Sequence, residues 1–466
     1  MLPKIETAQE FFEEFISATN EKKFSGLNED FGIRTIKSVP VTTHNSEMNA
    51  GTGDISMDCK ERYEALFNNI NQYNSGEVGI TRVAYTNEEQ TCTHAFMRMC
   101  KAENMDIRMD NCGNVIAKRK GKIKGLPPVV MGSHLDTVYQ GGKYDGVVGV
   151  TAALEVIKRL NEKGIETDHP IEVISFACEE SARFGVSTVG SKAMAGMFEK
   201  DKYRHLKDRD GISMEKAFSL VALDYDSVDQ ASRVNEDFKA YFELHIEQGP
   251  VLINNDKKIG IVTGIAAPVR FLIKINGKAS HSGTTPMIMR QDALLGASEI
   301  ALELEKAAKN EQDYETVATV GVMNIQNGAM NVVPGEVEMK IDIRSTSVDS
   351  RQRVVDQLNE SISAAKLQRQ LEIVCTKIIA EEPVLLSPEI NDVVKMKCEE
   401  KNLSYQFMQS GAGHDAMNIT RLCPVGLIFV PSIDGLSHHP NEYTEMDDIL
   451  KGIDLLEEVV LHYANS

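Results

Sequence analysis

The segment that most constrains the fold is a glycine-rich turn between a buried strand and a helix. It reads Gly132-Ser133-His134-Leu135-Asp136-Thr137-Val138 and, after two residues, continues as Gly141-Gly142-Lys143-Tyr144-Asp145-Gly146. The apolar run 128–131 before it predicts a strand, and apolar residues at helical spacing over 147–157 predict a helix after it. Ligands and catalytic groups gather at such strand ends in an open α/β sheet, so we expect the functional site here.

The order of strands and helices predicts an α/β catalytic domain that is interrupted by a second domain. Segments 59–263 and 380–466 show the alternation that is typical of an α/β sheet. Between them, 264–379 has the order strand-helix-strand-strand-helix-strand of a ferredoxin-like α+β domain. Its residues 336–344 strictly alternate apolar and polar side chains, which predicts a half-buried antiparallel strand. Residues 1–58 are expected to be an N-terminal extension.

Composition excludes several classes of partner. The 466 residues include 50 Lys plus Arg against 69 Asp plus Glu, a formal charge of -19, so neither nucleic acid nor anionic lipid is an expected partner. No apolar run approaches the length of a membrane span, and the N-terminus lacks a secretory signal. The eight cysteines never form Cys-x-x-Cys, which favours free thiols in a cytoplasmic protein over a zinc-thiolate site.

Four separate stretches place side chains that can bind metal at the ends of predicted strands. They contribute His134 with Asp145, Glu179 with Glu180, His245, and either His438 or His439. Imidazole and carboxylate ligands without thiolate suit zinc, manganese or cobalt, and a carboxylate can bridge two ions. A lone histidine or a glutamate pair at a strand end is more often structural or solvated. Four such stretches at one sheet edge nevertheless favour a metal site that could activate water.

The adjacent pair Glu179-Glu180 suggests a division of labour. One carboxylate can bind metal while its neighbour takes a proton from water and returns it to a leaving amine. Asp136, two residues after His134, fits a carboxylate that holds a metal-binding imidazole in one tautomer. The alternative for Asp136 is a turn residue that bonds to its own backbone.

Several motifs resemble those of the di-zinc amidohydrolase superfamily that includes aminoacylases and co-catalytic carboxypeptidases. They are His134-Leu135-Asp136-Thr137-Val138, Gly142-Lys143-Tyr144-Asp145-Gly146, Cys178-Glu179-Glu180 and Leu244-His245-Ile246-Glu247-Gln248-Gly249-Pro250. Segments 277–287, 331–335, 410–416 and 435–442 narrow the resemblance to N-carbamoyl-L-amino acid hydrolases, allantoate amidohydrolases and β-ureidopropionases. It extends from about residue 60 to the C-terminus.

This resemblance implies a fold, a cofactor and a set of site residues. The fold would be a di-metal exopeptidase-like α/β catalytic domain with an inserted ferredoxin-like lid domain through which the protein forms a homodimer. Two divalent ions per subunit (Zn, Mn, Co or Ni) would be bound by His134, Asp145, Glu180, His245 and His438, with Asp145 as the bridge. The family's ligand is the histidine directly after serine, which favours His438 over His439. Catalysis would involve Glu179 as general base, Asp136 and His281, and substrate contacts would come from Gln248, His281, Asn331, Arg344 and the backbone of Gly413.

General chemistry agrees with these roles. A substrate carboxylate favours a planar arginine, and a developing oxyanion needs donors such as His281 and Asn331. Without the resemblance, Arg290 would be an equal rival to Arg344, and His281 would be interpreted as a turn residue. The family also implies that His281 reaches the partner's site, so activity would require dimerisation and closure of the inserted domain.

The expected reaction is hydrolysis of the linear C–N amide bond of a ureido acid. An N-carbamoyl-L-amino acid would give an amino acid, carbon dioxide and ammonia, and segment 141–150 resembles the members that act on such substrates. Allantoate is the first alternative, followed by β-ureidopropionate and by a dipeptide. A non-catalytic binding protein would be expected to have lost ligands or the base, and every expected position is filled here.

Overall fold

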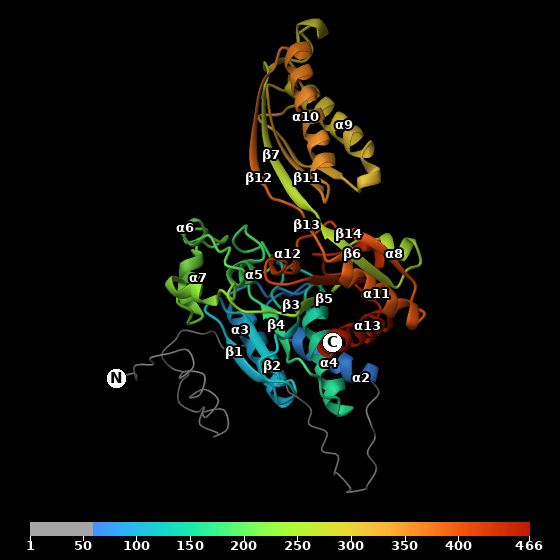
Figure 1. The fold of residues 1–466 in the computed structure, drawn as a ribbon. Helices are drawn as coiled ribbons and strands as arrows, with labels where there is room; N and C mark the ends of the chain where they lie inside the picture. Colours follow the sequence, from blue (N-terminus) through green and yellow to red (C-terminus); the bar gives the residue numbers. More distant parts are fainter. Residues whose placement is uncertain (1–58) are drawn as a thin grey trace, which may run out of the picture. The chain divides into compact units, whose positions relative to one another are not determined.

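The computed structural model describes residues 59–466, so the predicted N-terminal extension 1–58 lies outside the described residues (Figure 1). Within the described residues, Tyr63–Ser466 form one compact unit. Helix α2 (Cys59–Asn71) leads into this unit. The strands of this unit form a nine-stranded sheet, a four-stranded sheet and a two-stranded ladder.

The nine-stranded sheet carries the candidate site. Its strand order is β1-β2-β4-β3-β5-β15-β6-β13, and β14 pairs with β6. The strands are β1 (Asp106–Met109), β2 (Val115–Arg119), β3 (Val129–His134), β4 (Ile171–Phe176), β5 (Ala240–Ile246), β6 (Ile259–Ile265), β13 (Val384–Leu385), β14 (Tyr405–Ser410) and β15 (Val425–Val430). Strands β4, β3, β5 and β15 run parallel and are buried along their whole length, as expected for strands covered on both faces.

Helices cover both faces of this sheet. Helix α4 (Val147–Glu162) and helix α13 (Met446–Ala464) pack on one face, where the rings of Phe242 and Tyr463 lie 5.3 Å apart. The neighbouring Tyr241 points to the opposite face, because side chains alternate along a strand. There it packs in one cluster with residues of α5 (Val189–Met194) and α12 (Ala416–Ile419). Among residues 59–466, the remaining α-helices outside the 267–380 segment are α3 (Asn87–Ala102), α6 (Lys200–Tyr203), α7 (Met214–Leu220), α8 (Val251–Asn254) and α11 (Pro388–Glu400).

A separate four-stranded antiparallel sheet is formed by chain segments between residues 267 and 380. Its strands β7 (Ala267–Asn276), β9 (Val317–Ile325), β11 (Glu336–Ser345) and β12 (Glu372–Ala380) lie in the order β12-β7-β11-β9. Helices α9 (Ala293–Lys309) and α10 (Val348–Arg369) pack together on this sheet (Figure 1). The β-α-β-β-α-β chain order confirms the predicted ferredoxin-like arrangement, whereas the boundaries 264 and 379 stay a prediction.

Strand β11 confirms the predicted half-buried strand. Val337, Met339, Ile341 and Ile343 are buried in the core beneath α9 and α10, and the alternate residues are more exposed. The register places Asp342 opposite Arg270 of β7. This polar face of the sheet therefore presents charged side chains to one side of the molecule.

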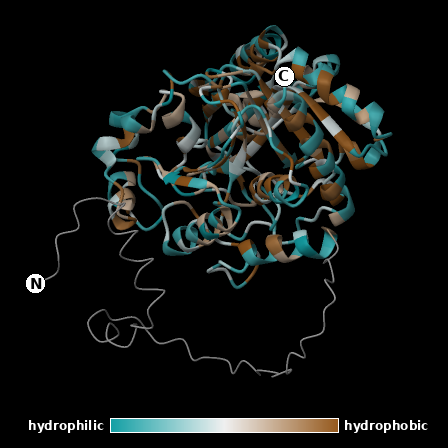
Figure 2. Ribbon diagram, turned by 60° about the horizontal axis from the view of Figure 1, so that its bottom comes forward, coloured by the Kyte–Doolittle hydropathy of each residue, from teal (hydrophilic) through white to brown (hydrophobic). Residues whose placement is uncertain are grey.

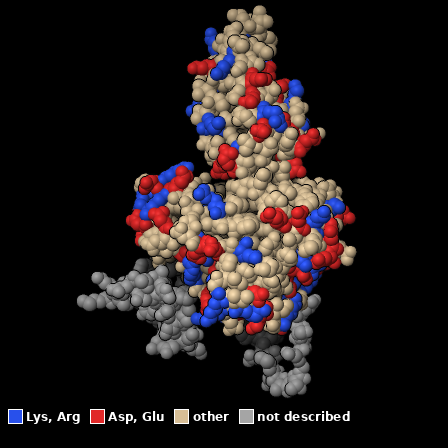
Figure 3. Space-filling model, in the orientation of Figure 1, with Lys and Arg blue, Asp and Glu red and all other residues tan. Residues whose placement is uncertain are grey.

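The surface shows no single dominant charge on the face in Figure 3, where Lys and Arg are interspersed with Asp and Glu. Helices carry polar and apolar residues side by side along their lengths in Figure 2, as expected for helices that pack one face on a sheet. Over residues 59–466 no helix has both the length and the apolar character that crossing a membrane requires. All eight cysteines lie in this range and none is in a disulfide, which confirms the expected free thiols.

Candidate active site

The predicted metal ligands meet at the carboxyl ends of the central parallel strands. His134 is the last residue of β3, Glu179 and Glu180 follow β4, and His245 lies one residue before the end of β5. Asp145 lies just before α4, and His438 comes from the loop after β15. The carboxyl ends of neighbouring parallel strands share one sheet edge, and this brings together residues from distant parts of the chain.

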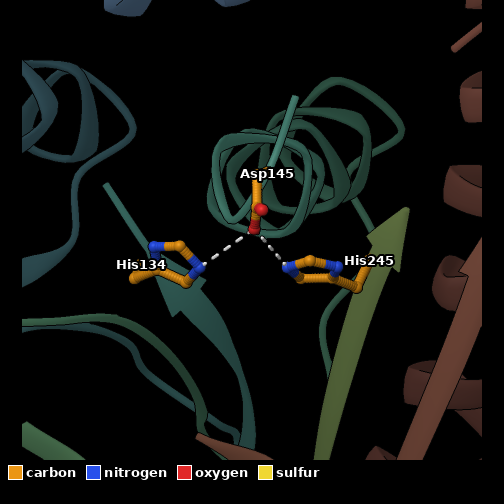
Figure 4. Close-up of side chains that lie close together, drawn as sticks. All are labelled: His134, Asp145 and His245. Carbon is orange, nitrogen blue, oxygen red and sulfur yellow. Dashed lines mark ion pairs between the residues drawn. The ribbon is translucent and has the colours of Figure 1, made fainter. Parts of the chain in front are cut away.

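One group of possible ligands consists of His134, Asp145 and His245, all buried. Nε2 of His245 lies 3.2 Å and Nε2 of His134 lies 3.5 Å from Oδ1 of Asp145. Figure 4 shows the two imidazoles approaching this carboxylate from opposite sides, one from β3 and one from β5. The three ligand atoms lie within 4.8 Å of one another, a spacing that could hold a metal ion.

A second group uses the other oxygen of the same aspartate. Nε2 of His438 lies 3.2 Å from Oδ2 of Asp145 and 3.2 Å from Oε1 of Glu180. These three residues also have ligand atoms within 4.8 Å of one another. Asp145 is therefore shared by both groups, which is the arrangement expected of a carboxylate that bridges two ions. His439 does not join them; its Nδ1 accepts a hydrogen bond from the backbone N–H of Asn441.

Hydrogen bonds to the backbone hold two of the imidazoles in place. Nδ1 of His134 lies 2.9 Å from the carbonyl oxygen of Asp136, and Nδ1 of His245 lies 2.9 Å from the carbonyl oxygen of Ile246. With Nδ1 on a backbone carbonyl, each ring turns its Nε2 toward Asp145, and this is the nitrogen that could bind a metal once it carries no proton.

The carboxylate of Asp136, expected to hold His134, lies within ion-pair distance of the imidazole but makes no hydrogen bond to it. Its Oδ1 is 3.8 Å from Nδ1 of His134, and the backbone carbonyl of Asp136 makes the contact instead. The carboxylate accepts hydrogen bonds from the backbone N–H groups of Glu179 at 3.1 Å and Glu180 at 3.0 Å. Asp136 therefore fixes both sides of the site, the imidazole through its backbone and the glutamate loop through its side chain.

The charges of this cluster fit a site for cations. Burial alone would raise the pKa of Asp145, but hydrogen bonds from His134, His245 and His438 hold that pKa well below its ordinary value. Burial likewise opposes the charged form of His134, yet the carboxylates around it, Glu179 first, raise its pKa well above its ordinary value. Three carboxylates and three imidazoles, all buried except the half-exposed His438, are the donor set that zinc, manganese, cobalt and nickel accept.

Glu179 lies beside both groups without belonging to either. Its Oε2 is 3.8 Å from Nε2 of His134, and the residue is 7% exposed. Burial, together with the nearby carboxylates of Glu180 and Asp415, raises the pKa of Glu179 well above its ordinary value, although His134 opposes this shift. A carboxylate that readily holds a proton at this place is suited to shuttle it.

Strained backbone marks the same loops. Cys178, Gln248 and His438 have φ angles of 53°, 58° and 55°, in the left-handed region that non-glycine residues rarely adopt. Each such residue costs about 1–3 kcal/mol, so the surrounding structure must hold it in place. At Gly146, φ is 68°, and a Cβ would lie 2.4 Å from the ring of His134. Only glycine fits between the start of α4 and this imidazole.

A cleft of about 910 Å³ opens over the cluster. Among the predicted substrate contacts, Gln248, Arg344 and Gly413 line it together with His134, Asp145, Glu179, Glu180, His245 and His438. The amide nitrogen of Gln248 donates to Oδ2 of Asp145 at 2.6 Å, while its carbonyl oxygen is buried without a hydrogen-bond partner among residues 59–466. It is an acceptor without a partner in the described chain, on a residue that lines the cleft.

The two candidate arginines differ in their surroundings. Arg344 lines the cleft, donates from Nε to Asp342 at 2.8 Å, and donates from Nη1 to the carbonyl of Gly411 at 2.8 Å. Arg290 lies outside the cleft lining and donates to the carbonyls of Ser282 and Thr285 in its own loop. The geometry therefore favours Arg344 as the group that meets a ligand.

His281 and Asn331 are not brought to this cleft by the same chain. His281 lies on the ladder formed by β8 (Ser280–His281) and β10 (Val332–Val333), Asn331 directly precedes β10, and both residues are exposed. Nδ1 of His281 accepts from the backbone N–H of Gly283, and the carbonyl of Asn331 accepts from the N–H of Ser282. Neither residue is part of the cleft lining.

Two acidic residues at the site, Asp342 and Glu442, have no role indicated by the sequence patterns. Asp342 holds Arg344, and Glu442 accepts hydrogen bonds from the backbone of Tyr144 and Asp145. The alternation of β11 did indicate that Asp342 shares a face with Arg344. For Glu442 the only signal was its place in the segment that also carries His438.

Comparison with known proteins gives consistent matches over most of the chain. A model of the peptidase family M20/M25/M40 matches residues 130–462. An uncharacterized hydrolase of Haemophilus influenzae is 44% identical over 385 residues, covering 83% of this chain and 93% of that protein. An N-carbamoyl-L-amino-acid amidohydrolase of Pseudomonas sp. is 36% identical over 387 residues, with the same shares covered. The crystal structure of an amidase of the hydantoinase/carbamoylase family from Burkholderia multivorans matches with a TM-score of 0.82 and 31% identity, covering 87% of this chain and 98% of that one.

Proposed function

The chain belongs to the peptidase family M20/M25/M40, and on that premise we propose that it is a metal-dependent hydrolase of the linear C–N amide bond in N-carbamoyl-L-amino acids. The observation that carries the proposal is the pair of ligand groups that share Asp145, with Glu179 beside them and Arg344 in the same cleft. The likeness to an amidohydrolase that acts on N-carbamoyl-L-amino acids supports the choice of substrate.

The cofactor would be two divalent metal ions per subunit. His134 and His245 would bind one ion, Glu180 and His438 the other, and Asp145 both. The donor set fits, because it offers carboxylate oxygens and imidazole nitrogens, and the backbone contacts of Nδ1 in His134 and His245 turn Nε2 of each ring toward Asp145. Such ions, when bound, lower the pKa of water and polarise the ureido carbonyl.

The remaining steps belong to the chain's own residues. Glu179 takes the proton of the attacking water and delivers it to the nitrogen of the amino acid as the C–N bond breaks. The amino acid and carbamate are released, and carbamate decomposes to carbon dioxide and ammonia. Asp136 keeps Glu179 in place through the hydrogen bond from the backbone of Glu179.

Three residues of the cleft would hold the substrate. The guanidinium of Arg344 would pair with the α-carboxylate, which matches its planar geometry. The free carbonyl oxygen of Gln248 would accept from the ureido NH2 group, and the backbone N–H of Gly413 would add a donor. A peptide substrate offers no such NH2 group at this place, which favours a ureido acid over a dipeptide.

The protein would act as a homodimer formed through the inserted domain. His281 and Asn331 are exposed and lie outside the cleft of their own chain, so a second subunit is the source that would bring them to it. β9 is the outer strand of its sheet and exposes Val317 (53%), Met323 (36%) and Ile325 (41%). An apolar edge strand of this kind is suited to pairing with another copy. The eight unpaired cysteines support a cytoplasmic location.

Complementation between inactive variants tests the shared site. His281→Ala and Glu179→Gln each remove one role, so each homodimer should be inactive. When the two variants are mixed in equal amounts after reversible dissociation, half of the dimers should be heterodimers. Each heterodimer has one intact site and one site that lacks both residues, so the mixture should recover about a quarter of the parental activity. No recovery, in a mixture shown to contain heterodimers, would refute a role for His281 in the partner's site.

Ammonia release from a small panel tests the reaction itself. The panel holds N-carbamoyl-L-methionine, allantoate, β-ureidopropionate and one dipeptide, each assayed with manganese- or zinc-loaded protein and again with a chelator. We expect chelator-sensitive release from N-carbamoyl-L-methionine that exceeds release from the other ureido acids. Cleavage of the dipeptide without ammonia from any ureido acid would refute the proposed substrate and leave only the metal site.

A further inference from the structure

The structure contains a buried carboxylate beneath the shared aspartate that no step above uses. Glu442 is 4% exposed. Its Oε1 accepts hydrogen bonds from the backbone N–H groups of Tyr144 at 2.8 Å and Asp145 at 3.1 Å. Its Oε2 lies 3.1 Å from the hydroxyl of Ser437. A buried carboxylate is unfavourable unless its oxygens are satisfied, and here the donors come from the two segments that carry metal-binding side chains.

The turn around Asp145 is shaped to receive this carboxylate. A Cβ at Gly142 would lie 2.1 Å from Oε1 and 2.2 Å from Cδ of Glu442. The absence of a side chain at Gly142 therefore leaves the space that the carboxylate fills. Two N–H groups of the same turn then converge on one oxygen, so the backbone of Asp145 is fixed relative to the loop that contains Glu442.

Ser437 extends the contact to the neighbour of His438. Its hydroxyl lies 2.9 Å from Oδ2 of Asp145 and 3.1 Å from Oε2 of Glu442. The hydroxyl has one proton and can donate to only one of these carboxylates at a time. When the oxygens of Asp145 are engaged by cations, Glu442 is the acceptor that remains. The amide nitrogen of Gln248 completes the network by donating to the Ser437 hydroxyl at 3.0 Å.

The two ligand groups depend on this network to different degrees. His134 and His245 lie on strands β3 and β5 at the centre of the sheet, where the ladder fixes their backbones. Glu180 and His438 lie in loops, and His438 has a strained φ of 55° that only its surroundings can maintain. A contact that ties the Asp145 turn to the loop of His438 therefore matters most for the second group.

We propose that Glu442 is a positioning residue for the group formed by Asp145, Glu180 and His438. It sets the separation between the shared aspartate Asp145 and His438, so the second ion binds tightly only when Glu442 is in place. This inference rests on the proposed two-metal hydrolase. It concerns metal binding, which can be measured without any substrate.

The experiment is a titration of Zn²⁺ into chelator-stripped full-length protein, followed by calorimetry and by metal analysis after dialysis. The parent should bind two equivalents. Glu442→Ala should bind the first with nearly parental affinity and the second at least about tenfold more weakly, as expected when a residue that orients ligands is lost. Glu442→Gln can still accept from both N–H groups and should restore the second site to within a few-fold. Glu445→Gln removes an exposed acid of the same loop and should match the parent.

Gly142→Ala provides a second variant that keeps the charge of Glu442 but fills its space. It should lower the affinity for the second ion as Glu442→Ala does. If Glu442→Ala does not fold, Gly142→Ala tests the proposal in its place. The proposal is overturned if Glu442→Ala, or in its place Gly142→Ala, binds both ions as the parent does, or if both affinities fall together. A protein that binds two ions in this Glu442-dependent way but releases no ammonia from ureido acids would refute the proposed function and leave this inference standing.

Discussion

The carboxylate of Asp136 accepts the backbone N–H of Glu179 at 3.1 Å, so the turn after β3 directly holds the loop after β4. This contact predicts the effect of Asp136→Asn. An amide nitrogen in place of one oxygen would face a backbone N–H and release the glutamate loop, because two donors cannot bond to each other.

We expect Asp136→Asn to lower kcat by about 10- to 100-fold with little change in KM. Steady-state rates on the ureido acid that the panel identifies would measure this. Asp106→Asn, which removes an exposed carboxylate on the edge strand β1, is the matched control. An unchanged kcat for Asp136→Asn would show that the hydrogen bond does not position Glu179.

Glu179→Gln separates proton transfer from metal binding. Glu179 belongs to neither ligand group, so the variant should keep its metal content while kcat falls by about 10²- to 10⁴-fold, the usual contribution of a general base. Glu180→Gln is the comparison, because it alters a proposed ligand and should lower the metal content itself. Metal analysis after dialysis and single-turnover rates distinguish the two. Full turnover by Glu179→Gln would remove it from the role of base.

The sequence predicts those elements best whose apolar and polar residues follow a regular pattern. The strand before the glycine-rich turn, β3, and the alternating strand β11 could be predicted from the sequence, because a buried apolar run and strict alternation are distinct signals. The edge-side strands β6 and β14 were not predicted. β14 is only partly buried and β6 contains glycines, so neither has a clear period. The short helices between β4 and β5 lack a periodic pattern for the same reason.

Within the site, the sequence could predict residue types but not which atoms face each other. All five proposed ligands come together because the ends of parallel strands must share an edge. In contrast, the carbonyl of Asp136 and not its carboxylate meets His134, and this depends on the dihedral angles of one turn. The role of Glu442 could not be predicted, because the backbone N–H groups that it binds, those of Tyr144 and Asp145, are distant in the sequence and come close only in the fold.

Asp342→Asn tests how Arg344 is held. Asp342 accepts from Nε of Arg344 at 2.8 Å and from Nε of Arg270 at 2.6 Å, and these hydrogen bonds outweigh partial burial and hold the pKa of the half-buried carboxyl below its ordinary value. Losing a charge-assisted hydrogen bond of about 1.5–3 kcal/mol should raise KM for a carboxylate substrate by about tenfold or more. Arg344→Ala should raise it further.

The specific control for Arg344 is a ureido substrate without the carboxylate, such as an N-carbamoyl amino acid amide. Both Asp342→Asn and Arg344→Ala should leave kcat/KM for the amide nearly unchanged. Equal losses on the acid and on the amide would assign these residues to the structure of the cleft and not to carboxylate binding. Arg290 lies outside the cleft lining, so Arg290→Ala should not lower kcat/KM for the acid relative to the amide.

The cysteines give a prediction that is independent of activity. Cys59 is exposed, Cys375 is partly buried, and the other six are buried. Burial raises the pKa of Cys92 to about 11 and that of Cys398 to about 12, so their reactive thiolate forms are scarce near pH 8. A thiol reagent at pH 8 should modify Cys59 quickly and Cys375 slowly, and should reach all eight only in denaturant. Rapid reaction of the six buried thiols in the native protein would contradict the packing described above.

Metal removal should lower the stability of the fold. An ion that binds the native state and not the unfolded chain raises the free energy of unfolding by about 2.7 kcal/mol when its free concentration is 100 times its Kd. The native cluster assembles carboxylates and imidazoles that the unfolded chain keeps apart, so the proposed ions should bind the native state preferentially. Thermal unfolding of chelator-treated protein should therefore occur at a lower temperature, and added Mn²⁺ or Zn²⁺ should restore it.

The identity of the ion and of the ligands provides the controls for this shift. Mg²⁺ prefers an octahedral shell of oxygen ligands, so a site that contains three imidazoles should gain little stability from it. His245→Ala removes one ligand from the His134–Asp145–His245 group and should reduce the stabilisation by Zn²⁺. An equal shift with Mg²⁺, or an undiminished shift in His245→Ala, would mean that the stabilising ions bind elsewhere than at Asp145.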